Sequence, residues 1–141
     1  MLKINKIYWL TDVPDVAISS DWINSVINKN GKKLARIDIV FCNDEFLLQM
    51  NRDYLQHDYY TDIITFDQSE QEGFVSGDIY ISLDRILENA LEANTSFENE
   101  LHRVVIHGVL HLLGFNDSTS SERNEMRSME DASLQILGIT N

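Results

Sequence analysis

Short runs of alternating apolar and polar residues dominate the first half of the chain. Residues 3–9, 34–42, 61–66 and 75–83 have the two-residue alternation or the β-branched and aromatic content that is typical of strands. The acidic, glycine-containing residues 67–74 separate the last two runs and have the composition of a turn. The pattern therefore predicts four strands, with the last two paired as a hairpin.

Five other segments repeat apolar residues every three or four positions, as the buried face of a helix does. The first begins at a cap at Ser19 or Ser20 and runs to Gly31, and the second begins at Asn43 or Asp44. The third covers 83–93, the fourth runs from about 97 to 113, and the fifth runs from Thr119 to Gly138. Strands early and helices late predict the α+β class. The length predicts a single domain over residues 1–141.

Individual residues predict the ends and inner faces of the later helices. Thr95 with Glu98, and Thr119 with Glu122, have the spacing of capping boxes, and Gly114 is suited to end a helix. The helix over 83–93 should turn one apolar stripe inward, made of Ile86, Leu87, Ala90 and Leu91. The last helix should do the same with Met126, Met129, Leu134 and Leu137.

Charge adds a constraint on function, because the 141 residues carry a formal net charge of −12. Affinity for nucleic acid comes mainly from Lys and Arg side chains that neutralise phosphates, so this charge disfavours nonspecific binding. Four of the eleven basic residues nevertheless lie within eight positions, namely Lys29, Lys32, Lys33 and Arg36. This basic cluster is either an RNA-binding patch or a solvated helix end and turn.

The sequence also bears on compartment. Asp12 and Asp15 interrupt the apolar residues that follow Lys3 and Lys6, so no signal peptide is expected, and no apolar stretch has the length of a membrane span. Cys42 is the only cysteine, which excludes an internal disulfide, and its apolar surroundings predict a buried, reduced thiol. We therefore expect a soluble cytoplasmic protein with no membrane and no disulfide partner.

Two histidines four residues apart carry the clearest chemical signal. In the segment His107-Gly-Val-Leu-His111 both imidazoles fall on one face of a helix, within reach of a single metal ion. The chain that returns after Gly114 can bring the carboxylate of Asp117 to the same ion. Two nitrogens and one oxygen leave a fourth position open for water, as in catalytic zinc sites.

Each part of this motif also has a structural explanation. Histidines at i and i+4 occur by chance on amphipathic helices, and Asp117 could be a turn or cap residue. Gly108 favours the metal site, because glycine costs a helix about 1 kcal/mol relative to alanine and so implies a close approach of substrate or backbone. His57 and His102 lack such a setting and are expected at the surface.

The segment HGVLHLLGFND closely resembles the signature H-G-x-L-H-L-x-G-aromatic-D-H of the YbeY family of metal-dependent endoribonucleases. The similarity covers about residues 36–138. It includes Asn51, the runs 61–66, 77–79 and 81–82, the approach 97–101 to the histidine helix, and Met126, Met129 and Glu130.

This resemblance implies a small mixed β-sheet flanked by helices, with a metal-binding helix of the zincin-like HxxxH type. It implies one Zn²⁺ per chain on His107, His111 and Asp117. It also implies a single-stranded RNA substrate, notably ribosomal RNA during maturation of the small-subunit 3′ end and in ribosome quality control. The partners would be ribosomal RNA and the small ribosomal subunit.

The sequence departs from the family pattern at two positions. Asp117 stands where the family usually has a third histidine, so a zinc site would carry one formal charge less and acidify its water less. Leu55 stands where the family has a functional arginine. Arg52, one turn earlier on the same helical face, is the nearest substitute.

Two other functions compete with metal-dependent RNA cleavage. A metalloprotease of the zincin type would need a glutamate directly after the first histidine, where Gly108 stands. A noncatalytic, zinc-containing ribosome-assembly factor would keep the metal and lack the arginine, which agrees with Leu55 and with the acidic charge.

Overall fold

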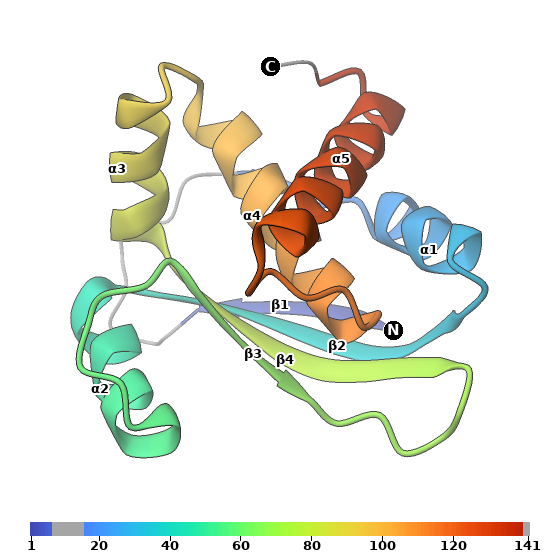
Figure 1. Cartoon of the computed structure of the whole chain (residues 1–141), viewed down its shortest axis with the longest axis horizontal. Helices are drawn as coiled ribbons and strands as arrows, with labels where there is room; N and C mark the ends of the chain where they lie inside the picture. Colours follow the sequence, from blue (N-terminus) through green and yellow to red (C-terminus); the bar gives the residue numbers. More distant parts are fainter. Residues whose placement is uncertain (7–15, 140–141) are drawn as a thin grey trace.

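The computed structural model describes residues 1–6 and 16–139, and its centre is a four-stranded sheet (Figure 1). The strands are β1 (Leu2–Lys6), β2 (Lys33–Cys42), β3 (Ile63–Asp67) and β4 (Phe74–Ser82). Their spatial order is β1-β2-β4-β3, with β1, β2 and β4 parallel and β3 antiparallel to β4. The predicted α+β class, mixed sheet and final hairpin are confirmed. Residues 7–9 of the predicted first strand lie outside the described residues.

Helices cover the sheet unequally. They are α1 (Ser20–Lys29), α2 (Asp44–Leu55), α3 (Leu83–Glu92), α4 (Phe97–Leu112) and α5 (Ser120–Ile136). Figure 1 shows α1, α3, α4 and α5 on one side of the sheet and α2 on the other. None of these helices combines the length and the apolar character needed to cross a membrane.

The alternation of side chains along the strands divides the core accordingly. Ile79 and Ile81 of β4 belong to the large core beneath α4, whereas Ile64 of β3 packs with Cys42 and Leu47 in a small core beneath α2. Cys42 is buried as predicted, and burial raises the pKa of its thiol to about 12.

Close contact between α4 and the sheet explains Gly108. A Cβ atom at this position would lie 2.8 Å from Cδ1 of Ile63 and 3.2 Å from Cδ1 and Cγ2 of Ile79. Side chains of the sheet, rather than substrate or backbone, therefore require the glycine. The short separation holds the histidine helix directly on β3 and β4.

The helix ends agree with the sequence except at the start of α4. Ser96 caps α4, because its Oγ accepts the backbone N–H three residues later at 3.0 Å. The predicted capping box of Thr95 with Glu98 is wrong by one position, since two hydroxyl residues in a row can both serve as caps. The box of Thr119 with Glu122 is confirmed.

Three leucines predicted to face inward are exposed instead. Leu87 and Leu91 lie on the outer side of α3, with Leu91 72% exposed, and Leu137 is exposed after the end of α5. The helix α3 buries a narrower stripe of Leu83, Ile86 and Ala90. The helix has the predicted apolar stripe, but the packing partners of α3 cover only part of it.

His102 is a further correction, because it is 5% exposed rather than on the surface. Its ring packs against Trp22 of α1 with centroids 5.4 Å apart, and its Nδ1 lies 2.7 Å from the carbonyl oxygen of Glu98. One local hydrogen bond and an aromatic neighbour make this burial possible. His57, the other histidine predicted at the surface, is exposed.

Candidate metal centre

Two imidazoles project from one face of α4. His107 and His111 are one helical turn apart, and their Nε2 atoms lie 3.0 Å from each other. Both side chains are partly buried, whereas the helix around them is almost wholly buried. A helix fixed in this way holds the two nitrogens in a defined geometry.

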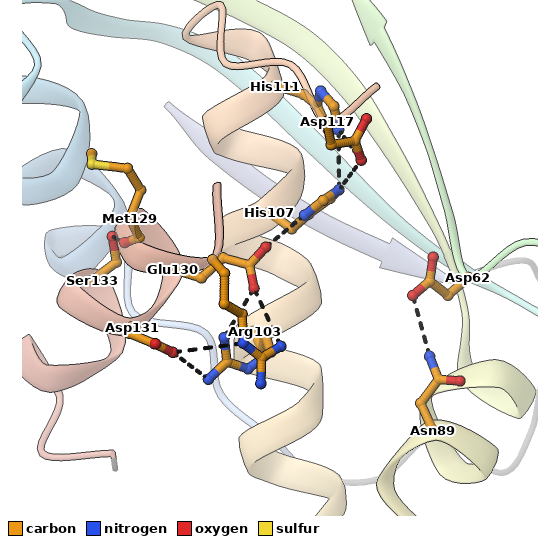
Figure 2. Close-up of polar contacts among 11 residues, drawn as sticks. Asp62, Asn89, Arg103, His107, His111, Asp117, Met129, Glu130, Asp131 and Ser133 are labelled. Carbon is orange, nitrogen blue, oxygen red and sulfur yellow. Dashed lines mark hydrogen bonds and ion pairs between the residues drawn. The ribbon is translucent and has the colours of Figure 1, made fainter. Parts of the chain in front are cut away.

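Asp117 reaches the same point from the loop between α4 and α5. Gly114 adopts a φ of +104°, a left-handed conformation that favours glycine, and so turns the chain back at the end of α4. Oδ2 of Asp117 then lies 3.3 Å from Nε2 of His107 and 3.3 Å from Nε2 of His111 (Figure 2). Thr119, two residues later, caps α5, so Asp117 is held between two helix ends.

The three donor atoms have the spacing of metal ligands. Ligands about 2.0–2.2 Å from a tetrahedral ion lie about 3.3–3.6 Å from one another. The observed separations of 3.0, 3.3 and 3.3 Å are close to this range. No fourth His, Cys, Asp or Glu of residues 1–6 and 16–139 joins the group, so the described part of the chain offers three ligands. The donor set of two nitrogens and one carboxylate oxygen fits Zn²⁺.

Glu130 of α5 orients His107. Its Oε2 accepts a hydrogen bond from Nδ1 of His107 at 2.7 Å. With the proton on Nδ1, the neutral ring has its lone pair on Nε2, which points toward His111 and Asp117. Oε1 of Glu130 accepts from Nη1 of Arg103 at 2.9 Å, and Nη2 of Arg103 donates to Asp131 at 2.8 Å (Figure 2). The side chains of Glu130 and Arg103 are each 7% exposed. An oriented, ion-paired acceptor of this kind is the usual support of a metal-binding histidine.

Comparison with known proteins identifies the family of this chain. The family model described as Endoribonuclease YbeY matches residues 11–138. The chain belongs to the YbeY endoribonuclease family. Endoribonuclease YbeY of Cytophaga hutchinsonii is 51% identical over 82% of this chain and 80% of its own length. The protein of the same name from Parabacteroides distasonis is 48% identical over 92% of this chain and 94% of its own length.

A solved structure has a similar fold. The solution structure of TM1509 from Thermotoga maritima superimposes with a TM-score of 0.61 and covers 97% of this chain and 91% of that one. The sequence identity is 23%, so this likeness concerns the fold alone.

Charges around this YbeY site raise the proton affinity of His107. Burial by itself lowers the pKa of His107, but the hydrogen bond and charge of Glu130, with the charges of Asp117 and Asp62, raise it above its ordinary value. A histidine ligand must be neutral to bind a metal, so a metal ion competes with this proton.

Asp62 lies on the β3 side of the site. It directly precedes β3, and Nδ2 of Asn89 donates to its Oδ2 at 3.2 Å (Figure 2). Burial raises the pKa of Asp62, and the charge of His107 opposes that shift. A partly desolvated carboxylate beside a metal site has the properties of a proton acceptor.

Arg52 and Leu55, the two positions considered for a catalytic cation, are both exposed on α2. Arg52 of α2 donates from Nε to Oδ1 of Asp58 at 2.5 Å, and both side chains are largely exposed. Leu55, at the position of the missing family arginine, is exposed at the end of α2. The function of Arg52 stays a prediction.

The lysines of the basic cluster lie at the connection between α1 and β2. Lys29 and Lys33 are exposed. Nζ of Lys32 donates to the carbonyl oxygen of Leu113 at 3.4 Å, directly beside the loop that carries Asp117. These lysines are thus close to one end of α4, and their RNA-binding role stays a prediction.

Arg36, the fourth member of the basic cluster, forms hydrogen bonds and ion pairs with residues on or next to the sheet. It donates to Asp38 of its own strand and, at 3.0 Å, to Oε1 of Gln68, and it lies 3.7 Å from Asp78. Two aspartates therefore offset its charge.

Sequence reasoning missed the support of His107. Glu130 appeared only as part of the family resemblance, and Arg103 was not singled out. A charged residue between Leu101 and Val104 in an apolar helix is a signal for a buried ion pair. Its partner on α5 becomes apparent only from the packing.

Proposed function

We propose that this chain is a metal-dependent endoribonuclease that forms one domain and cleaves single-stranded RNA, with one Zn²⁺ on His107, His111 and Asp117. The triangle of donor atoms, each about 3 Å from the others, supports the metal site. Membership of the YbeY family supports RNA as the substrate class, since the similar proteins are named endoribonucleases.

Ribosomal RNA is the substrate that we propose within this class. The family resemblance favours maturation of the small-subunit 3′ end and ribosome quality control, in the cytoplasm and in contact with the small ribosomal subunit. The low number of basic residues agrees with a substrate presented by a larger particle rather than with capture of free RNA.

The residues of the chain divide the work of phosphodiester cleavage. A bound Zn²⁺ supplies Lewis acidity, which polarises a phosphoryl oxygen and activates water. Glu130 holds the proton on Nδ1 of His107 and so keeps Nε2 available. Asp62 accepts the proton of the attacking hydroxyl or water as the nucleophile's oxygen bonds to phosphorus, and it returns that proton to the ribose oxygen whose bond to phosphorus breaks. In this proposal the guanidinium of Arg52 gives up its ion pair with Asp58 and binds a phosphate of the RNA.

A noncatalytic ribosome-assembly factor is the second candidate. The pairing of Arg52 with Asp58 and the presence of Leu55 favour it, because neither position offers an unpaired positive charge to an RNA phosphate. Gly108 directly after the first histidine disfavours a metalloprotease.

Metal analysis combined with an RNA cleavage assay tests the proposal. Purified protein should contain one zinc per chain and cut an end-labelled single-stranded RNA, and a chelator should abolish cutting until zinc is restored. His111→Ala and Asp117→Ala should lose both metal and cleavage, whereas Asp21→Ala, an exposed aspartate of α1, should lose neither.

The outcomes separate the candidates. Stoichiometric metal in both ligand variants would contradict the site. Metal bound by His107, His111 and Asp117 without cleavage of any RNA tested, including the assembled small subunit, would favour the assembly factor.

A further inference from the structure

Four aromatic rings are exposed near one another in sequence, Tyr54 in the last turn of α2 and the other three in the connection from α2 to β3. Tyr54, Tyr59 and Tyr60 are 68%, 56% and 52% exposed, and His57 between them is also exposed. Exposed rings scattered singly are ordinary, but four within seven positions form a contiguous feature of the sequence. We call these four residues the aromatic loop.

The aromatic loop is held in shape by the backbone. Gln56 adopts a left-handed conformation with a φ of 56° that ends α2. The backbone N–H of His57 donates to the carbonyl oxygen of Asn51 at 3.0 Å, and Nδ2 of the buried Asn51 donates to the carbonyl oxygen of Tyr59 at 2.9 Å. The loop is therefore preorganised, which lowers the entropy lost when a ligand binds.

Two of the rings stack on each other. The rings of His57 and Tyr59 stack with centroids 5.1 Å apart and an interplanar angle of 19°, and the Tyr59 hydroxyl lies 2.9 Å from Nδ1 of His57. Tyr60 is held separately, with its hydroxyl on Glu45 at 3.3 Å and the guanidinium of Arg85 6.0 Å from its ring centre. Tyr54 meets Phe66 edge to face. Each ring thus has a defined position while staying accessible.

The aromatic loop leads to Asp62, on the β3 side of the metal centre. Tyr60 is two residues before Asp62, whose carboxylate lies on the β3 side of His107 (Figure 2). In Figure 1 this loop and the connection between α1 and β2, which carries the basic cluster, lie on opposite sides of α4. A chain bound across the metal centre would therefore have lysines on one side and rings on the other.

Charge explains why rings, rather than cations, suit this side. The chain has a net charge of −12, and the two arginines near the loop are both paired, Arg52 with Asp58 and Arg85 with Asp44. Phosphate contacts are consequently scarce here. Unpaired bases stack on aromatic side chains with little dependence on charge or sequence, and rigid rings lose little entropy on stacking.

We infer that the aromatic loop of Tyr54, His57, Tyr59 and Tyr60 stacks against unpaired bases of single-stranded RNA that extends past Asp62 on the β3 side of the metal centre. This inference rests on the proposed function for the identity of the ligand. It adds a base-binding surface to the metal centre and predicts that the protein discriminates a base from an abasic sugar on this side.

Binding of two matched oligomers tests the inference. The probes are a fluorescent oligouridylate and an abasic ribose-phosphate oligomer of the same length, titrated by anisotropy with chelator-treated protein so that nothing is cut. The oligouridylate should bind at least about tenfold more tightly, since each stacked base contributes a factor of this order. Tyr59→Leu should remove about tenfold for the oligouridylate and leave the abasic oligomer unchanged.

Variants separate stacking from damage. Tyr59→Phe keeps the ring and should keep the preference for bases, and Leu91→Ala, an exposed apolar position on α3, should behave as the wild type. Equal affinity for the two oligomers, or an equal loss for both in Tyr59→Leu, would overturn the aromatic loop as a base-binding surface.

A cleavage assay with the oligouridylate and zinc-loaded protein distinguishes failure of the proposed function from failure of the base-binding surface. Cleavage without a preference for bases would overturn the aromatic loop and leave the proposed function intact. A preference for bases that depends on Tyr59, without cleavage, would support the surface and count against the nuclease.

Discussion

Nδ1 of His107 and Oε2 of Glu130 lie 2.7 Å apart and join the histidine helix α4 to α5. Glu130→Gln keeps the size of the side chain and removes its charge. We expect zinc affinity to fall about 10- to 100-fold, as is usual when the acceptor behind a metal-binding histidine is lost. Competition with a chromophoric chelator at neutral pH measures this.

Asp131→Asn is the matched control for Glu130→Gln. Asp131 shares Arg103 with Glu130 but does not contact His107. A much smaller loss is therefore expected. Equal losses in the two variants would show that the effect runs through Arg103 and helix packing rather than through His107.

On acidification the protein should start to lose zinc at a higher pH than a site with an ordinary histidine ligand would. Glu130 and the neighbouring carboxylates overcome the effect of burial and raise the pKa of His107, so the proton stays bound above the ordinary histidine value of about 6.5. Because only the neutral ring binds metal, zinc affinity should begin to fall above that pH as the solution is acidified. In Glu130→Gln the fall should begin at lower pH. An unchanged onset would rule out Glu130 as the cause.

Asp62→Asn should stabilise the metal-free protein and reduce activity. Burial raises the pKa of Asp62, so its charged form costs stability above that raised pKa, and the cost vanishes below the unfolded value of about 3.9. The variant should therefore melt at higher temperature near neutral pH, with the difference lost in acid. Loss of a proton acceptor should slow RNA cleavage about 10²- to 10⁴-fold. Asp21→Asn, at an exposed aspartate of α1, should show neither effect.

Gly108→Ala should destabilise the protein despite the better helix propensity of alanine. Propensity gains about 1 kcal/mol, whereas a methyl group 2.8 Å from Cδ1 of Ile63 costs about 1–3 kcal/mol of packing strain. We expect a net loss of about 1 kcal/mol in urea unfolding. Asn124→Ala, exposed in α5, reports propensity alone. Adding Ile63→Val, which removes the contacting Cδ1, should recover part of this lost unfolding free energy. If the effects of the two substitutions on that free energy simply add, the contact between residues 108 and 63 is contradicted.

The parts of the site that the sequence predicted are the local ones. His107 and His111 share a face because of helix geometry alone, and Gly114 marks the turn that returns Asp117. Glu130 depends on how α4 and α5 pack, and no pattern within either helix encodes that packing. The same limit explains Leu87 and Leu91, whose spacing predicts an apolar stripe without saying whether anything covers it.

The dependence of His107 on α5 also orders events during synthesis. Glu130 is added to the growing chain 23 residues after His107, and it reaches His107 only once α5 has formed and docked on α4. A nascent chain that has emerged as far as α4 presents its two histidines without their oriented acceptor. While α5 is still inside the ribosome, the metal centre of a protein proposed to cut ribosomal RNA therefore lacks the acceptor that strengthens its hold on zinc.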